Sequence, residues 1–176
     1  MRVHPVALFV ACMILASSTP GHATTVLPMS LEDLVDRSEV VAHVRVGQVR
    51  ILQQDNVPFR VTELEVIEAF QGARRGEVLE LWQRGDGQIF VVGDPFLEEG
   101  QEGLAFLRRV EGRVYLTALA QSFWWIDGQG VQAVARRDLD DLAIVPLGEP
   151  RVMPPNRLRW AELRELVIDA CLGVTP

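Results

Sequence analysis

The chain has 176 residues and a formal net charge of −7, and all of its strongly basic residues are arginines. Nucleic-acid phosphates attract positively charged surfaces, so this acidic balance argues against a nucleic-acid-binding protein. No run of basic residues is longer than two, which argues against binding to anionic lipid.

The first 23 residues are predicted to be a secretory signal peptide. A short basic start precedes an apolar run over residues 6–16, which is shorter than the ~20 residues that cross a bilayer. Small residues at Gly21 and Ala23 match a signal-peptidase site, so we expect cleavage after Ala23 and a periplasmic or extracellular protein. A lipoprotein anchored through Cys12 is the alternative, but the apolar run before that cysteine is too short.

Cysteine usage excludes an internal disulfide in the mature chain. Only Cys171 remains after the signal is removed, so core packing must stabilise a domain of about 150 residues. Cys171 follows an apolar helical pattern. We therefore expect a buried thiol, with intermolecular pairing as the alternative.

A short helix is predicted near the start of the mature chain. Ser30 and Asp33 have the spacing of a capping box, which marks the first turn of a helix. Leu31, Leu34 and Val35 then share one helical face, so this face should pack against the core.

The centre of the chain is predicted to form a series of strands. Apolar and polar residues alternate over 38–52 and 59–72, which is typical of half-buried strands. Three further segments complete the series: a strand over 76–87, a short apolar strand over 88–96, and a hairpin over 104–126. The strands recur about every dozen residues with turn signals between them, which favours a small antiparallel barrel or sandwich.

The last part of the chain, residues 136–176, is predicted to differ from the strands before it. A proline-containing connection leads to Asn156, which is expected to cap an amphipathic helix over 157–173. This helix needs an apolar surface to cover. We therefore expect residues 24–135 to form the barrel domain and the C-terminal helix to pack on it.

Three stretches of the chain resemble a known family: LEDLVDRSEVVAHVRVGQVR, VTELEVIEAFQG and DPFLEEGQEGLAFLRR. The family consists of uncharacterised secreted bacterial proteins, and its layout is similar to the netrin-like domain of tissue inhibitors of metalloproteinases. The resemblance covers about residues 28–126 and implies a small antiparallel OB-like barrel. The inhibitory mechanism is not implied, because those inhibitors use an N-terminal cysteine where this mature chain would begin at Thr24. Their disulfides have no counterpart here.

No catalytic, cofactor-binding or metal-binding residue is predicted. His43 is the only histidine of the mature chain, and strand alternation places it on the outward, solvated face. A zinc site would need several ligands at suitable spacing. No Gly-x-Ser-x-Gly motif occurs, and a dyad of Cys171 with His43 would have to join a C-terminal helix to a strand.

One acidic cluster invites comparison with a calcium site. Asp138, Asp140 and Asp141 lie close together, but they lack the order, the glycine and the terminal glutamate of an EF-hand loop. We expect a solvated turn in which these carboxylates pair with Arg136 and Arg137.

Phe123, Trp124 and Trp125 are the remaining candidates for a binding surface. Neighbouring residues of a strand point to opposite faces, so both faces of this strand become bulky. We expect the C-terminal helix to cover one face, with Leu163 and Leu166 buried against Trp124 or Trp125. A patch in which the three aromatic residues bind a partner is the alternative.

These features together predict a secreted, non-enzymatic binding or accessory module. Its partner is expected to be another envelope or extracellular protein, and neither a cofactor nor an integral membrane segment after signal cleavage is expected. Enzymatic activity is left open. The alternative is a secreted hydrolase whose site no motif reveals.

Overall fold

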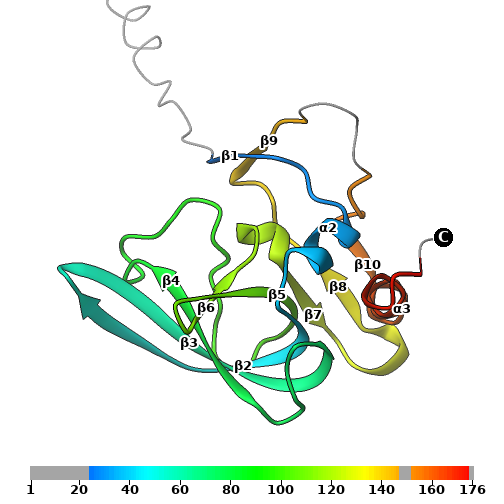
Figure 1. Cartoon of the computed structure of the whole chain (residues 1–176), viewed down its shortest axis with the longest axis horizontal. Helices are drawn as coiled ribbons and strands as arrows, with labels where there is room; N and C mark the ends of the chain where they lie inside the picture. The colour runs from blue at the N-terminus through cyan, green and yellow to red at the C-terminus, as the bar shows by residue number, and fades with distance from the viewer. Residues whose placement is uncertain (1–23, 147–151, 175–176) are drawn as a thin grey trace, which may run out of the picture.

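The structure, a computed structural model, describes residues 24–146 and 152–174. The predicted signal peptide lies outside the described residues. The described chain is mainly β, with an eight-stranded sheet that curls into a ring, a separate two-stranded sheet and two α-helices (Figure 1). This confirms the predicted small OB-like barrel with a short N-terminal helix and an amphipathic C-terminal helix. No helix in the described ranges is both long and apolar enough to span a membrane.

Five strands close the barrel: β2 (Val40–Gln54), β3 (Val57–Gln71), β4 (Val78–Arg84), β5 (Glu102–Val110) and β6 (Arg113–Leu116). Their order around the ring is β5-β2-β3-β4-β6, and β6 then pairs with β5. Neighbours run antiparallel except β4 and β6, which meet in parallel at Leu81 and Val114. The first three of these strands follow the predicted segments closely.

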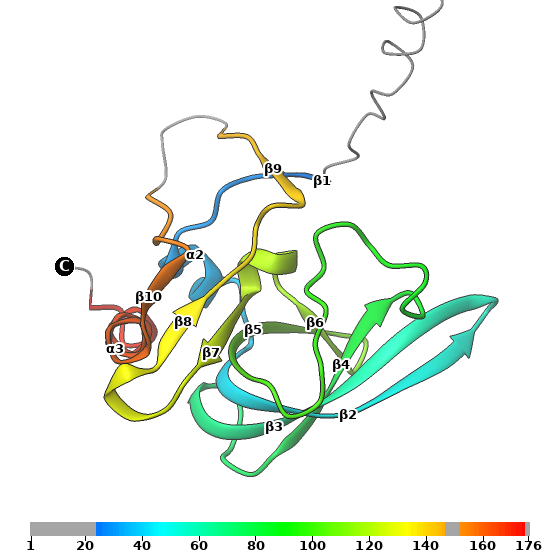
Figure 2. The same cartoon turned by 180° about the vertical axis from the view of Figure 1, so that it is seen from behind.

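The β2–β3 hairpin forms where the sequence alternates most clearly. Val44 and Val46 are buried, whereas Arg45 between them is exposed. The hairpin turns at Asp55 and Asn56, whose φ angles of 50° and 61° suit a tight turn of two residues. Its tip projects beyond the ring, away from the C-terminal helix (Figures 1 and 2).

The interior of the barrel is one apolar cluster. Phe123 and Trp125 belong to it, although both follow the last strand of the ring. Gly103 makes room for this packing, because a Cβ atom there would lie 2.4 Å from Cζ of Phe123. The other members of the cluster are mainly branched aliphatic residues: Val40, Val44, Val46, Leu64, Val66, Leu79, Leu81, Leu97, Leu107, Val114 and Leu116.

The sheet continues beyond the ring through three short strands: β7 (Phe123–Asp127), β8 (Val134–Arg136) and β10 (Arg157–Arg159). β7 pairs with β5, β8 with β7, and β10 with β8, all antiparallel. The predicted domain boundary between residues 135 and 136 therefore falls inside β8.

The predicted hairpin over 104–126 is wrong in its second strand, which is not continuous. β6 ends at Leu116, a 3-10 turn follows at Leu119–Ser122, and β7 starts at Phe123. The break has a topological cause, because β6 pairs with the end of β5 whereas β7 pairs with its beginning. The chain must cross between these two sites. The hydroxyl of Ser122 stabilises the crossing by accepting a hydrogen bond of 2.6 Å from the backbone N–H of Ala118.

Two helices pack on the outer face of this continued sheet: α2 (Leu31–Asp36) and α3 (Trp160–Cys171). The predicted capping box of α2 is present, since Oγ of Ser30 accepts a 3.2 Å hydrogen bond from the backbone N–H of Asp33. A second apolar core lies beneath the helices. Its buried members are Met29, Leu31, Leu34, Val35, Val41, Leu104, Phe106, Trp124, Ala135, Leu163 and Val167.

Two predicted boundaries need correction. The C-terminal helix starts at Trp160, because residues 157–159 pair with β8 as β10 instead of forming the first helical turn. Asn156 does not cap it, and its side chain accepts a hydrogen bond from Arg137. The predicted apolar strand over 88–96 is reduced to a single bridge between Gly85 and Phe90.

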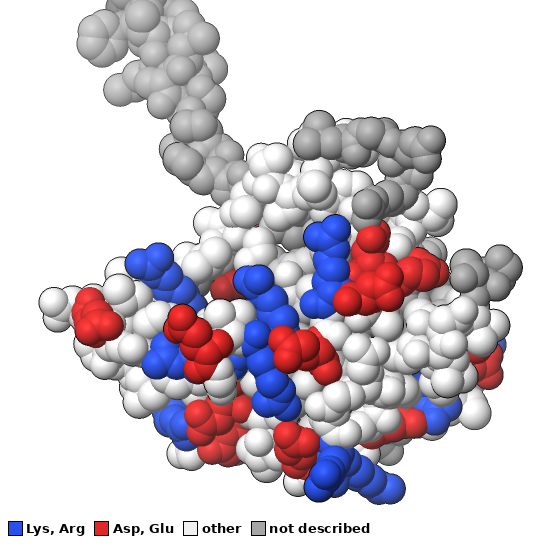
Figure 3. All heavy atoms as spheres, viewed as in Figure 1, with Lys and Arg blue, Asp and Glu red and all other residues white. Residues whose placement is uncertain are grey.

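The outer surface of the barrel carries interspersed charges. On the face shown in Figure 3, arginine and carboxylate side chains lie beside one another. Arg45 pairs with Glu102 at 2.8 Å and Arg50 pairs with Glu63 at 3.5 Å, in both cases between neighbouring strands. Exposed pairs of this kind contribute little to stability, so this face is an ordinary solvated sheet surface.

Candidate functional site

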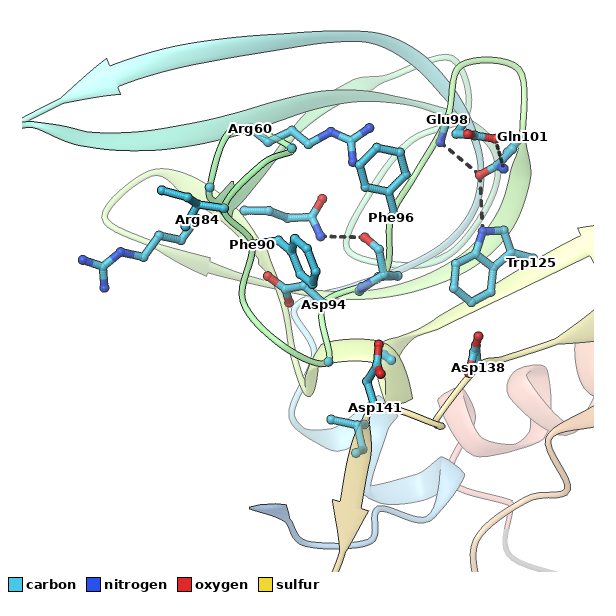
Figure 4. Close-up of a pocket in the computed structure, with 18 of the residues that line it drawn as sticks. Arg60, Arg84, Phe90, Asp94, Phe96, Glu98, Gln101, Trp125, Asp138 and Asp141 are labelled. Atoms are coloured by element: carbon cyan, nitrogen blue, oxygen red, sulfur yellow. Dashed lines mark hydrogen bonds between the residues drawn. The ribbon is translucent and has the colours of Figure 1, made fainter. Parts of the chain in front are cut away.

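An open cleft of about 550 Å³ lies at one end of the barrel. Its volume is within the roughly 300–1,000 Å³ of typical ligand sites. The long connection from β4 to β5 forms one wall, and β7 with the turn after β8 forms the other (Figure 4). The side chains that define it are Phe90, Asp94, Phe96, Trp125, Asp138 and Asp141.

Glycines and backbone hydrogen bonds shape the wall that follows β4. Gly85 and Gly93 have positive φ angles, and a Cβ atom at Gly85 would lie 2.0 Å from the carbonyl oxygen of Ile89. Oδ1 of Asp86 accepts hydrogen bonds from the next backbone N–H groups, including that of Ile89 at 2.8 Å. The chain therefore doubles back at this point.

Two barrel side chains hold the same wall in place. Nε2 of Gln83 donates a 3.0 Å hydrogen bond to the carbonyl oxygen of Pro95, and Arg60 donates to the carbonyl oxygen of Leu97. The guanidinium of Arg60 also lies over the ring of Phe96, 3.9 Å from its centroid. These contacts hold the connection from β4 to β5 against the barrel.

The cleft combines apolar surface with fixed polar groups. Ile89, Phe90 and Phe96 are each more than half exposed, which is unusual for three large apolar side chains on one loop. A small part of the Trp125 ring is exposed in the cleft. Its indole N–H donates a 3.3 Å hydrogen bond to Oε1 of Gln101. Such rings offer a ligand a rigid apolar surface.

Two acceptor groups on the β4 side of the cleft have no partner among the described residues. The carboxylate of Asp94 makes neither a hydrogen bond nor an ion pair there, and burial raises its pKa to about 6. Oε1 of Gln83 is buried and likewise lacks a hydrogen bond, although the residue is only 7% exposed. Asp94 is only partly buried, so its carboxylate is open to a ligand, whereas Oε1 of Gln83 is closed to solvent and is an unsatisfied acceptor of the interior.

The acidic turn after β8 is exposed as predicted, but its predicted arginine pairs are wrong. Arg136 pairs with Asp127 at 2.6 Å. Arg137 is only 4% exposed, lies 4.5 Å from the ring centroid of Trp124, and donates a 3.0 Å hydrogen bond to Asn156. Burial lowers the pKa of the Arg137 guanidinium to about 10. The difference arises because the alternation of β8 continues one residue past its end, so Ala135 and Arg137 are both buried and Arg136 between them is exposed.

The predicted aromatic residues divide between the two cores. Phe123 and Trp125 lie inside the barrel, and Trp124 packs in the second core with Leu163 of α3. The predicted seam is thus present for Leu163 and Trp124. Leu166 is 41% exposed and its predicted burial is wrong, because Val167, one turn after Leu163, occupies the inner face instead.

Partner binding through Phe123, Trp124 and Trp125 stays a prediction. The first two rings are fully buried and Trp125 is 9% exposed, so a partner in this conformation could touch only the edge of Trp125. That edge lies in the cleft.

His43 is not the solvated residue that was predicted. Trp160 of α3 covers it at a ring-centroid distance of 5.0 Å, and Nε2 lies 3.2 Å from Oε2 of Glu102. Burial lowers the pKa of His43, against the opposing effect of Glu102. The imidazole is therefore packed under the C-terminal helix.

Cys171 is half-buried at the edge of the second core, and burial raises the pKa of its thiol. A raised pKa disfavours the reactive thiolate, in keeping with the expected structural role. Intermolecular pairing stays a prediction.

Among the described residues, no three or more His, Cys, Asp and Glu side chains are grouped so that they could hold a metal ion. No family model, curated protein or solved structure matches the chain. The properties of the site must therefore be inferred from its own geometry.

The cleft was missed by the sequence reasoning, although two signals mark it. The turn sequences Gly85-Asp86-Gly87 and Gly93-Asp94-Pro95 enclose a short apolar stretch, whose composition is typical of a strand. The two turns limit the pairing of this stretch to a single bridge at Phe90 and leave its apolar side chains on a loop.

Proposed function

We propose that the protein is a secreted, non-enzymatic binding module and that its cleft is the binding surface. The observation that carries this proposal is the composition of the cleft, in which the exposed ring of Phe90 lies beside the partnerless carboxylate of Asp94 and exposed Phe96 lines the same cleft (Figure 4). Exposed apolar side chains next to a few fixed polar groups are typical of ligand sites.

The lining of the cleft favours binding over catalysis. The described residues that form it include no serine, threonine, cysteine, histidine, lysine or tyrosine. Covalent catalysis through a hydroxyl, thiol or amine is therefore not available to this lining, whose only nucleophilic side chains are carboxylates. His43 and Cys171 are outside the lining.

Secretion and the type of partner belong to the same proposal. The apolar N-terminal segment and the small residues before Thr24 support export, and the resemblance to secreted bacterial proteins agrees with it. We propose another envelope or extracellular protein as the partner.

A secreted hydrolase is the second candidate, and one observation favours it. The pKa of Asp94, raised to about 6, would keep part of this carboxyl protonated near neutral pH, as a general acid requires. Asp138 and Asp141 line the same cleft and could supply the second carboxylate of a glycoside hydrolase.

Affinity capture from the envelope and medium tests the binding proposal. The bait is the chain starting at Thr24, compared with Phe90→Ala in the cleft and Val131→Ala as a matched control. Both side chains are exposed, so neither substitution should disturb folding. We expect the control to retain the partner and Phe90→Ala to lose it, whereas equal capture by all three proteins would refute the role of the cleft.

Assays on glycans, peptides and esters separate the two candidates. We expect no turnover by the purified mature chain. Hydrolysis that disappears in Asp94→Asn would establish the hydrolase and refute the non-enzymatic proposal.

A further inference from the structure

Two carboxylates of the cleft have no partner among the described residues. They belong to Asp94 and Asp141, neither of which makes a hydrogen bond or ion pair with the described residues. A ligand that satisfies them must bring hydrogen-bond donors.

The positive charges of the lining are already engaged or directed elsewhere. Arg60 donates to the carbonyl oxygen of Leu97, and Arg136 pairs with Asp127. The guanidinium of Arg84 points away from the labelled carboxylates (Figure 4). Asp94 is therefore left without a neutralising charge, and so are the carboxylates of the turn after β8.

The aromatic rings of the cleft are suited to the same kind of ligand. A cation is attracted to the face of an aromatic ring, and the cleft already shows this contact twice. Arg60 lies over Phe96 at 3.9 Å, and Arg136 lies over Trp125 at 5.4 Å. The ring of Phe90 is exposed beside Asp94, with no cation contact of its own among the described residues.

We propose that the cleft binds a basic side chain, arginine or lysine, of an extended segment of the partner protein. The positive group meets Asp94 and Asp141, and its methylene stem lies on Phe90. This inference rests on the proposed binding function and specifies the chemistry of its partner. The net charge of −7 of the chain adds long-range attraction for such a segment.

Two other occupants fit less well. An anion would meet the free carboxylates, which repel it. A metal ion would need grouped ligands, and the described residues contain no such group. The volume of about 550 Å³ leaves room for a side chain together with its apolar neighbours.

Titration with short capped peptides, followed by NMR and calorimetry, tests the inference. The probes are acetyl-Leu-Arg-Leu-amide and acetyl-Leu-Lys-Leu-amide, with the neutral glutamine peptide as the matched control and maltotriose as a neutral sugar. We expect both basic peptides to bind at least about tenfold more tightly than the glutamine peptide, with shifts at Phe90 and Trp125.

Variants identify the carboxylates responsible. We expect Asp94→Asn and Asp141→Asn each to weaken binding of the arginine peptide several-fold, and Asp140→Asn, which makes the same charge change outside the lining, to leave it unchanged. Asp141 is exposed, so its variant tests the inference even where Asp94→Asn alters the loop.

Three outcomes would overturn the inference: equal affinity for the arginine and glutamine peptides, preference for maltotriose, or no shifts with ~10 mM basic peptide. If partner capture still depended on Phe90, the binding proposal would survive and only the basic partner would be refuted. If capture did not depend on Phe90, the binding proposal itself would fail.

Discussion

Replacing Asp94 by asparagine should stabilise the protein above neutral pH. Burial raises the pKa of the Asp94 carboxyl from 3.8 to about 6, so the folded state binds a proton more tightly than the unfolded state. Stability therefore falls as the pH rises from about 4 to about 6, and the full cost of the ionised carboxylate is present above that range. Asparagine has nearly the same shape and no charge to desolvate.

The size of this effect follows from the raised pKa. The full difference between the two pKa values corresponds to at most about 3 kcal/mol, because one pKa unit equals about 1.4 kcal/mol. Asp94 is partly open to solvent in the cleft, and screening reduces the value. We expect Asp94→Asn to raise the free energy of unfolding by about 1–2 kcal/mol at pH 7.5 and by much less at pH 4.

Urea unfolding at the two pH values, followed by tryptophan fluorescence, measures the effect. Asp140→Asn serves as the control, because it removes an exposed carboxylate from the neighbouring turn. Equal stability of Asp94→Asn and the parent chain at pH 7.5 would show that the ionised Asp94 carboxylate does not destabilise the folded protein. That result would also weaken the case for a ligand, because binding groups commonly reduce stability in the free protein.

Three further predictions concern packing and export. Leu163→Ala should lower the free energy of unfolding by about 2–5 kcal/mol, whereas Leu166→Ala on the exposed side of the same helix should cost less than about 1 kcal/mol in the same urea titration. Gly103→Ala should cost about 1–3 kcal/mol by crowding Phe123, and an unchanged melting temperature would contradict this packing. Mass spectrometry of the native protein should find Thr24 as its first residue, and a retained Met1 would contradict export.

The fold was predictable where local patterns and tertiary contacts agree. Alternation defined β2, β3 and β4 because each has one buried face, and the capping box of Ser30 with Asp33 defined α2. The predicted start of the C-terminal helix at Asn156 is wrong, because the preference of asparagine for a helix start competes with the pairing of residues 157–159 to β8. Local preference is weaker than a strand pairing that extends a sheet.

The site was less predictable because it depends on segments far apart in the chain. The cleft needs the loop around Asp94 to meet the turn at Asp141, and no pattern within either segment reports that meeting. The burial of Arg137 has a signal in the sequence. Its position two residues after the buried Ala135 predicts an inward side chain, whereas its acidic neighbours suggested a surface pair.

The aromatic residues of β7 affect how strongly the register of this strand in the sheet is specified. Most strands are polar on one face, so a slip by one residue would bury polar groups and is rejected. β7 offers bulky apolar residues to both cores, and a slipped alignment would exchange Phe123 and Trp125 for Trp124 without burying charge. The space left by Gly103 and the hydrogen bond from Trp125 to Gln101 favour the correct alignment. Enlarging Gly103 should therefore produce a second conformer, visible as doubled NMR signals along β7.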